Sequence, residues 1–137
     1  MGIHQPERMI EYQLTGRCKD KKRVDKFVGD VFYHYFKNRM KRTVLVDVKF
    51  VTELGKGKIA GYCHGDKNEV QIDIARTENG EPYTTRDICL NLAHELVHAK
   101  QFIRGEKSSL IYVYSERPHE VEAYKMEEHL VTEYYDN

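Results

Sequence analysis

The sequence contains no tryptophan, and it has only three cysteines and three prolines among its 137 residues. It also lacks any apolar run close to the ~18 residues that a membrane-spanning helix needs, and its mean hydropathy is −0.70. These absences exclude a helical membrane protein. No basic stretch followed by an apolar one opens the chain, as it would in a secretory signal, so we expect an intracellular, cytoplasmic protein.

The cysteines do not form a recognisable set. Cys18, Cys63 and Cys89 are odd in number, and none of them belongs to a C-x-x-C motif. The odd number and the spacing favour reduced thiols over a disulfide framework.

Charge is balanced overall but not along the chain. The 22 basic and 22 acidic side chains cancel, yet residues 1–58 carry a net charge of +7 and residues 59–137 a net charge of −7. The balance argues against nucleic-acid binding over the whole surface, although a local basic face remains possible. That face would comprise Arg17, Lys19, Lys21, Lys22, Arg23, Lys26, Lys37, Arg39, Lys41 and Arg42.

Hydrophobic periodicity predicts an α+β fold in one domain over residues 1–137. Apolar residues spaced three and four apart predict a long N-terminal helix over residues 20–41. A short strand over residues 8–16 precedes it. Alternating apolar residues then predict three strands, joined by short turns into a mainly antiparallel sheet of about three to four strands. These strands cover residues 43–53, 59–64 and 69–75.

Two further helices follow the predicted sheet. Helical spacing runs from Ile88 to Ile103, with Thr84 or Thr85 as the N-cap and Gly105 as the C-cap. Pro118 is well suited to the start of a last helix over residues 118–133.

The second predicted helix contains the motif His94-Glu95-Leu-Val-His98. Two histidines four residues apart lie one helical turn from each other, so both imidazoles can bind one metal ion. Glu95 lies ~100° around the helix from His94, where it can take a proton from a water molecule at that ion. The H-E-x-x-H arrangement is typical of zinc-dependent peptidases, so we expect one Zn²⁺ per chain.

A catalytic zinc site needs a third protein ligand. No histidine follows at the H-E-x-x-H-x-x-G-x-x-H spacing, so the ligand must come from later in the chain, where the last helix offers candidates. Helical geometry allows only one of Glu120 and Glu122 to face the metal. Glu120 is the preferred candidate, Glu122 is the alternative, and His119 is the third choice.

His94-Glu-Leu-Val-His98, followed by Glu120-Val-Glu-Ala-Tyr124, resembles the gluzincin type of zinc metallopeptidase. It is particularly similar to the minimal single-domain members, the minigluzincins, and to small H-E-x-x-H…E-x-E-A proteins of bacteria and phages. The resemblance covers residues 43–133. It implies a zincin-like domain in which Glu120 is the third zinc ligand. Gluzincins often place an acidic or amide residue four positions after that glutamate, where this chain has Tyr124.

The expected activity is that of a zinc metalloendopeptidase acting on a protein or peptide, with Glu95 as general base. Candidate donors to the oxyanion are Tyr112, Tyr114 and Tyr124, with His119 in the same region. The resemblance implies that an extended substrate pairs with the edge of strand 69–75, on which Val70, Ile72 and Ile74 alternate with polar residues. Cys63 stands where its thiolate would cap the zinc and keep the enzyme latent, but a buried, unreactive cysteine is the simpler interpretation.

Two other functions remain open. One is a zinc-binding regulatory or interaction module that keeps the fold without turnover, against which the presence of Glu95 argues. The other is nucleic-acid association through the basic residues of the first half, which is less favoured because such charges usually form the solvated face of a helix.

Overall fold

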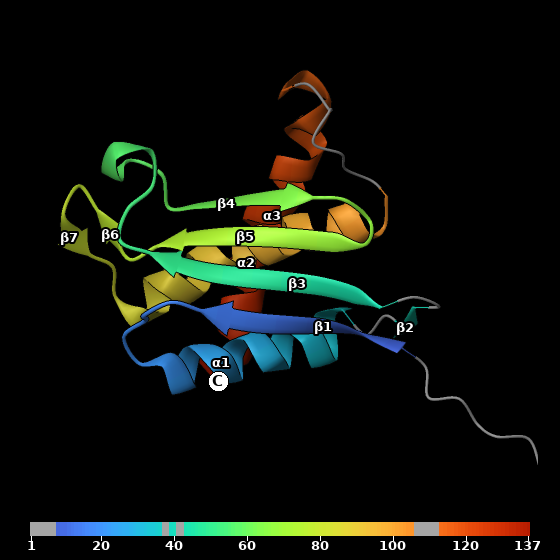
Figure 1. Ribbon diagram of the computed structural model, residues 1–137, viewed down its shortest axis with the longest axis horizontal. Helices are drawn as coiled ribbons and strands as arrows, with labels where there is room; N and C mark the ends of the chain where they lie inside the picture. Colours follow the sequence, from blue (N-terminus) through green and yellow to red (C-terminus); the bar gives the residue numbers. More distant parts are fainter. Residues whose placement is uncertain (1–7, 37–38, 41–42, 106–112) are drawn as a thin grey trace, which may run out of the picture.

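The computed structural model describes residues 8–36, 39–40, 43–105 and 113–137. Within them the protein is α+β, with three α-helices and a five-stranded mixed sheet in the order β2-β1-β3-β5-β4. The strands are β1 (Arg8–Thr15), β2 (Arg39–Met40), β3 (Val44–Val51), β4 (Gly61–Gly65) and β5 (Glu69–Ala75). The helices are α1 (Lys21–Val31), α2 (Thr85–Ile103) and α3 (Val113–Tyr134). Figure 1 shows α1 below the sheet and α2 behind it, with the first turns of α3 (orange) rising above β4.

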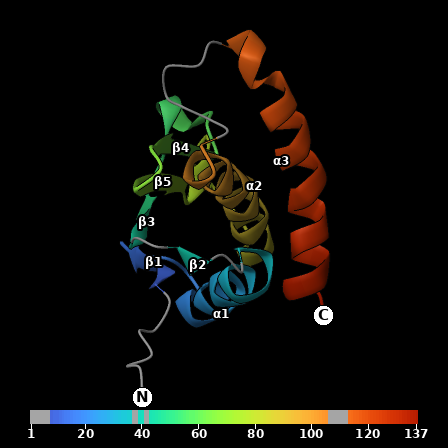
Figure 2. The ribbon, with the colours of Figure 1, turned by 90° about the vertical axis from the view of Figure 1, so that its right-hand side faces the viewer.

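The arrangement is layered, with α2 lying between the sheet and α3 (Figure 2). Both faces of α2 are therefore covered along much of its length, and most of its side chains are buried, among them Leu92, Leu96 and Phe102. No helix in the described ranges combines the length and the apolar character that a membrane crossing requires.

The predicted antiparallel meander is wrong in its strand order. β3 pairs in parallel with both β1 and β5, while β4 pairs antiparallel with β5. The connection from β3 to β4, which includes a 3₁₀ turn at Gly55–Gly57, is long enough to leave room for β5 between them. The turn from β4 to β5 is tight, because the Asp66 carboxylate accepts hydrogen bonds from the backbone N–H groups of Asn68 and Glu69.

The prediction that strand 69–75 forms an edge is also wrong. β5 lies inside the sheet between β3 and β4, and Val70, Ile72 and Ile74 are fully buried. Their side chains face the helices, whereas the polar residues between them lie on the face that the helices leave open. The edge strand on this side is β4.

The first helix is shorter than predicted. Its α-helical part ends at Val31 and continues as a π-helical segment, Phe32–Phe36, instead of running to residue 41. The ring of Phe32 stacks between those of Tyr12 and Phe36, with centroid distances of 4.8 and 4.3 Å. This aromatic packing against β1 accompanies the wider helical turn. The sequence did reveal β1, which covers the predicted strand over residues 8–16.

Helix α2 begins as predicted. The hydroxyl oxygen of Thr84 accepts a hydrogen bond from the backbone N–H of Asp87 at 3.1 Å, as an N-cap does. The helix ends before Gly105, whose φ of +76° favours glycine. Between β5 and this helix, the chain forms a small hairpin of β6 (Thr77–Glu78) and β7 (Glu81–Pro82).

Helix α3 begins at Val113, so Pro118 lies inside it and not at its start as predicted. Its far end is held by three aromatic or charged contacts. Arg23 donates to the backbone oxygen of Tyr135 and lies over its ring, and Arg86 makes a bidentate pair with Asp136 at 2.9 and 3.0 Å. The rings of His34 and Tyr134 stack at 5.3 Å. These contacts fix α3 against α1 and the start of α2.

Gly16, between β1 and α1, lies in a position where a side chain would clash with the backbone of β3. Its φ is +90°, and a Cβ there would lie 2.5 Å from the carbonyl oxygen of Phe50. We expect Gly16→Ala to lower the free energy of unfolding by about 2 kcal/mol or more. Gly80→Ala is the matched control, because Gly80 has a φ of +85° but no atom within 4 Å of its Cβ position. Equal losses in denaturant unfolding would show that the contact with Phe50 contributes nothing.

Candidate metal centre

One face of α2 provides the floor of a cavity of about 440 Å³. The residues on this face are spaced as i, i+3, i+4, i+7 and i+11, so they form a continuous stripe along the helix. They are Asn91, His94, Glu95, His98 and Phe102. Strand β4 forms one wall of the cavity and α3 contributes to another, through Glu120, Tyr124 and Glu127.

His94, His98 and Glu120 meet in this cavity, with one ligand atom of each lying within 4.8 Å of the others. Nε2 of His94 is 3.5 Å from Oε1 of Glu120, and Nε2 of His98 contacts the same oxygen. The two imidazole rings are 4.9 Å apart and almost perpendicular. The cluster is therefore built from one turn of α2 and one residue of α3.

Each histidine is oriented through its other nitrogen. Nδ1 of His98 lies 2.8 Å from Oε1 of Gln101, and Nδ1 of His94 lies 3.2 Å from Oε1 of Glu127. Nε2 of Gln101 donates to the backbone oxygen of His119 and to Oε1 of Glu122, at 3.0 and 2.8 Å. Because both of these oxygens only accept, Gln101 must turn its own oxygen toward His98.

These contacts select the tautomers. A glutamine oxygen and a carboxylate oxygen both accept, so Nδ1 carries the hydrogen in His98 and in His94. The lone pairs then lie on the Nε2 atoms, which face Glu120. Because Gln101 is 1 % exposed and His98 is 4 % exposed, this orientation is held inside the protein.

The donor set fits a zinc ion. Two imidazole nitrogens and one carboxylate oxygen are the ligands of a catalytic zinc site with one position left for water. Two ligand atoms around a tetrahedral zinc ion lie about 3.4 Å apart, close to the 3.5 Å between His94 and Glu120. The contact between His98 and Glu120 brings two electron-rich atoms together, an arrangement that a cation would stabilise.

Glu95 lies beside His94, His98 and Glu120 but is not one of the three candidate metal ligands. It is 8 % exposed and lines the cavity where α2 faces β4. A Cβ on Gly61 would lie 3.0 Å from Cγ of Glu95 and 3.2 Å from its Oε2. Glycine at position 61 therefore allows the Glu95 carboxyl group to lie against β4.

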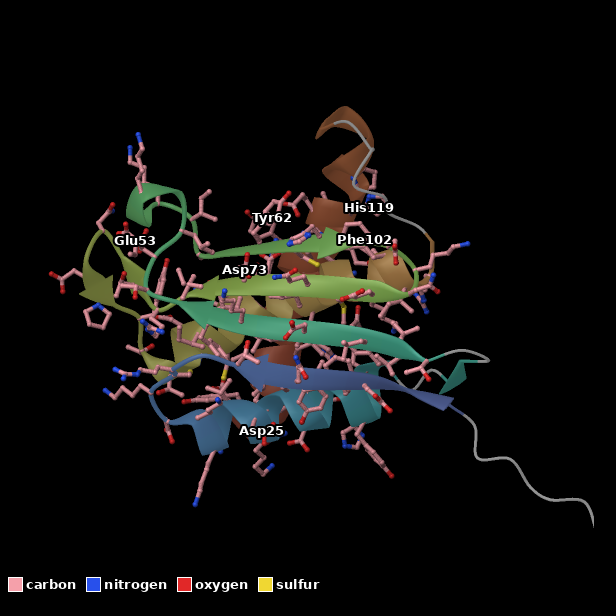
Figure 3. The ribbon with its side chains drawn as sticks, viewed as in Figure 1. Asp25, Glu53, Tyr62, Asp73, Phe102 and His119 are labelled. Atoms are coloured by element: carbon pink, nitrogen blue, oxygen red, sulfur yellow. The ribbon has the colours of Figure 1, made fainter. Side chains whose placement is uncertain are left out.

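The other two candidates for third ligand have different contacts. Glu122 accepts a hydrogen bond from Gln101, and the backbone oxygen of His119 accepts another. Neither residue belongs to the cluster formed by His94, His98 and Glu120. Within the described residues, Nδ1 of His119 is buried without a hydrogen-bond partner, and the residue does not line the cavity. Figure 3 shows His119 near Phe102, at the far end of α2.

Three tyrosines were considered as oxyanion donors, and the structure describes the side chain of one of them, Tyr124. It is 63 % exposed, lines the cavity, and its ring lies 4.7 Å from that of His94. Tyr112 lies outside the described residues, as does the side chain of Tyr114.

Cys63 also lines the cavity from β4 and is 9 % exposed. Cys63 does not belong to the cluster of candidate ligands formed by His94, His98 and Glu120.

Sequence reasoning missed Glu127 and Gln101. It considered Tyr124, four residues after Glu120, as the position of the orienting residue, whereas the structure has Glu127 seven residues after Glu120 in that role. Both spacings place a side chain on the same face of a helix. Gln101 follows His98 by three residues, so helical spacing carried a signal for it as well.

The Glu127 carboxyl group is affected by two opposing influences. Burial raises its pKa above the ordinary value, while its hydrogen bond and electrostatic interaction with His94 lower it. A carboxylate here helps to hold the hydrogen of His94 on Nδ1.

We therefore expect Glu127→Leu to weaken zinc binding by about 10–100-fold, because His94 loses the group that orients it. A competitive titration with a chromophoric chelator measures this change. Glu128→Leu is the matched control, since Glu128 is the exposed neighbour on the same helix. Equal affinities of the two variants would exclude the orienting role of Glu127.

Comparisons of the sequence with models of known protein families and with curated proteins gave no match.

Proposed function

We propose that the protein is a zinc-dependent metallopeptidase of the gluzincin type, with a zincin-like fold. The observation that carries the proposal is the convergence of His94, His98 and Glu120 in a cavity that also contains Glu95. The first three supply the ligands of a catalytic zinc site, and Glu95 is the additional acid–base group that hydrolysis needs.

His94, His98 and Glu120 would hold one zinc ion per chain. When bound, zinc would supply a Lewis acid that makes water a better nucleophile near neutral pH and polarises the peptide carbonyl group. The order of elements supports the gluzincin type, because the H-E-x-x-H motif lies on α2 and the third ligand on the following helix, α3.

Glu95 moves the proton in the proposed reaction. Its carboxylate accepts a proton from the attacking water molecule and then gives that proton to the nitrogen of the departing amine. The C–N bond breaks, a C–O bond forms, and the products are a carboxylic acid and an amine. Burial against Gly61 holds the carboxyl group of Glu95 in place for both transfers.

The substrate strand would lie along β4, because β5 is inside the sheet. Residues 60–64 line the cavity, and β4 has a neighbour on one side only within the described residues. An extended peptide beside such an edge satisfies the outward-facing backbone groups by strand addition. Tyr124, on the α3 side, is the candidate donor to the oxyanion that the described side chains support.

Zinc removal tests the proposed function. The zinc-loaded protein is incubated with a pool of unstructured peptides, and new amino termini are identified by mass spectrometry. We expect cleavage that stops when a chelator removes the zinc and returns when one equivalent is restored. Zinc binding without cleavage of any peptide would contradict the peptidase assignment and favour a zinc-binding module.

A further inference from the structure

A second cavity lies on the opposite side of the sheet from the candidate metal centre. Its volume is about 500 Å³, and we call it the β1 groove because β1 and the first half of α1 line it. Figure 1 shows β1 as the lowest long strand of the sheet, with α1 beneath it, while β4 and the metal centre lie at the other side. The lining residues of the groove are Tyr12, Gln13, Leu14, Lys21, Lys22 and Asp25.

Most of β1 has a neighbouring strand on one side only. Among the described residues, β3 pairs with β1 from Ile10 to Thr15, whereas β2 pairs with it only at Arg8 and Met9. The second half of β1 is therefore a sheet edge, and the β1 groove runs along it.

The register of β1 and β3 shows which backbone groups face the groove. Val48 of β3 lies opposite Leu14, and its backbone oxygen faces β1, because it accepts a hydrogen bond from the Thr15 hydroxyl group at 3.3 Å. In a parallel pair, this geometry turns the N–H and C=O groups of Leu14 away from β3, together with those of Tyr12 two residues earlier. Both residues therefore present an unpaired donor and acceptor on the groove side.

The surroundings of the groove are positively charged. Residues 17–26, which lead into α1 and form its first half, contain six basic and two acidic side chains, a net charge of +4. Lys21 and Lys22 are exposed, so their ammonium groups can reach a bound chain. The acidic residue in the groove, Asp25, already accepts a hydrogen bond from the Tyr12 hydroxyl group at 3.0 Å.

A strand edge combined with positive charge favours an acidic peptide as the occupant. The backbone of an extended peptide pairs with outward-facing N–H and C=O groups, and its carboxylates pair with lysines. A nucleic acid would use the lysines through its phosphates and would leave the strand edge unused. A second copy of this chain, pairing β1 with β1, would bring two basic segments together.

We propose that the β1 groove binds an extended, acidic segment of a partner protein, which adds to the sheet as a strand beside β1. Hydrogen bonds to Tyr12 and Leu14 hold its backbone, and Lys21 and Lys22 select its charge. The groove is separate from the metal centre, so this interaction does not depend on the proposed peptidase function.

Nuclear magnetic resonance tests the proposal with a blocked peptide of eight residues, in which threonine and glutamate alternate. The peptide is added to the zinc-loaded protein labelled with ¹⁵N. We expect the amide signals of Tyr12 and Leu14 to move most and their hydrogen exchange to slow, because these N–H groups become hydrogen bonded. Signals of Gln13 and Thr15, which face β3, should move less. Unchanged signals at Tyr12 and Leu14, or changes confined to β4, would overturn the proposal.

A charge reversal tests the role of the lysines. Lys22→Glu should weaken binding of the peptide about 5-fold, because it replaces an attraction with a repulsion at an exposed site. Lys125→Glu is the matched control, since Lys125 is an exposed lysine on α3, and it should leave the affinity unchanged. Equal affinities of the two variants would show that charge does not select the occupant.

Two further probes distinguish strand addition from other kinds of binding. The same peptide with every backbone nitrogen methylated keeps its carboxylates but cannot donate backbone hydrogen bonds, so it should bind much more weakly. If it binds as tightly as the unmodified peptide, no strand is added and the proposal is wrong. The second probe is an oligothymidylate of eight nucleotides. If it moves the signals of residues 17–26 and the peptide does not, this basic segment is a nucleic-acid surface instead.

Discussion

Replacing Glu95 by glutamine should lower kcat/KM by about 10²–10⁴-fold and leave one zinc ion per chain. Glutamine has nearly the same shape as glutamate, so it can occupy the space beside Gly61 in which Glu95 lies. Its amide cannot accept the proton of the attacking water or return it to the leaving amine. Because Glu95 is not one of the three converging ligand residues, metal binding should persist.

Steady-state hydrolysis of one peptide by both proteins, at equal measured zinc content, checks this expectation. Glu128→Gln is a suitable control, since it removes an exposed carboxylate from α3 and should leave the rate unchanged. An active Glu95→Gln variant would remove the general base from the mechanism. A variant that loses its zinc would instead show that Glu95 contributes to the metal site.

The second large effect concerns the third ligand. Glu120→Gln should weaken zinc binding by more than the 10–100-fold that the loss of an orienting residue costs, since it removes a negatively charged ligand oxygen. Glu122→Gln should bind zinc with nearly the wild-type affinity. Its remaining side-chain oxygen can still accept the hydrogen bond that Gln101 donates to Glu122.

The two variants form a matched pair because both replace a glutamate by glutamine on the same helix, two residues apart. Competitive zinc titrations of both, with circular dichroism to verify the fold, give the answer. A larger loss of affinity in Glu122→Gln than in Glu120→Gln would reverse the assignment of the third ligand.

The parts of the site that lie within one helix could be predicted from the sequence. Helical spacing places His94 above His98, and Thr84 gives the start of α2. Helical geometry allowed only one of Glu120 and Glu122 to face the metal, and the resemblance to gluzincins favoured Glu120. The structure brings Glu120, and not Glu122, to the two histidines.

The sheet order could not be obtained in the same way. Alternation along residues 69–75 shows that one face is apolar and the other polar, and this pattern is the same for an interior strand and an edge strand when one sheet face is open. What makes β5 interior is the pairing of β3 and β4 on its two sides, which depends on contacts distant in sequence. The edge strand is therefore β4 and not the predicted strand over residues 69–75.

The orienting residues depend on packing for a related reason. Whether Tyr124 or Glu127 reaches Nδ1 of His94 is determined by the angle and height at which α3 crosses α2. Contacts far from the site set that position, including the pairing of Arg86 with Asp136. Helical periodicity places both positions on the same face of α3, yet only Tyr124 was considered from the sequence, because the spacing alone does not single out Glu127.

The central claim is that His94, His98 and Glu120 form a zinc site, and native mass spectrometry tests it most directly. The wild type, loaded with excess zinc and freed of unbound ion, should carry one zinc ion per chain. A His94→Ala/His98→Ala double variant treated identically should carry none. If the wild type shows only the mass of the metal-free chain, or if both proteins take up the same amount of zinc, these residues do not form a zinc site.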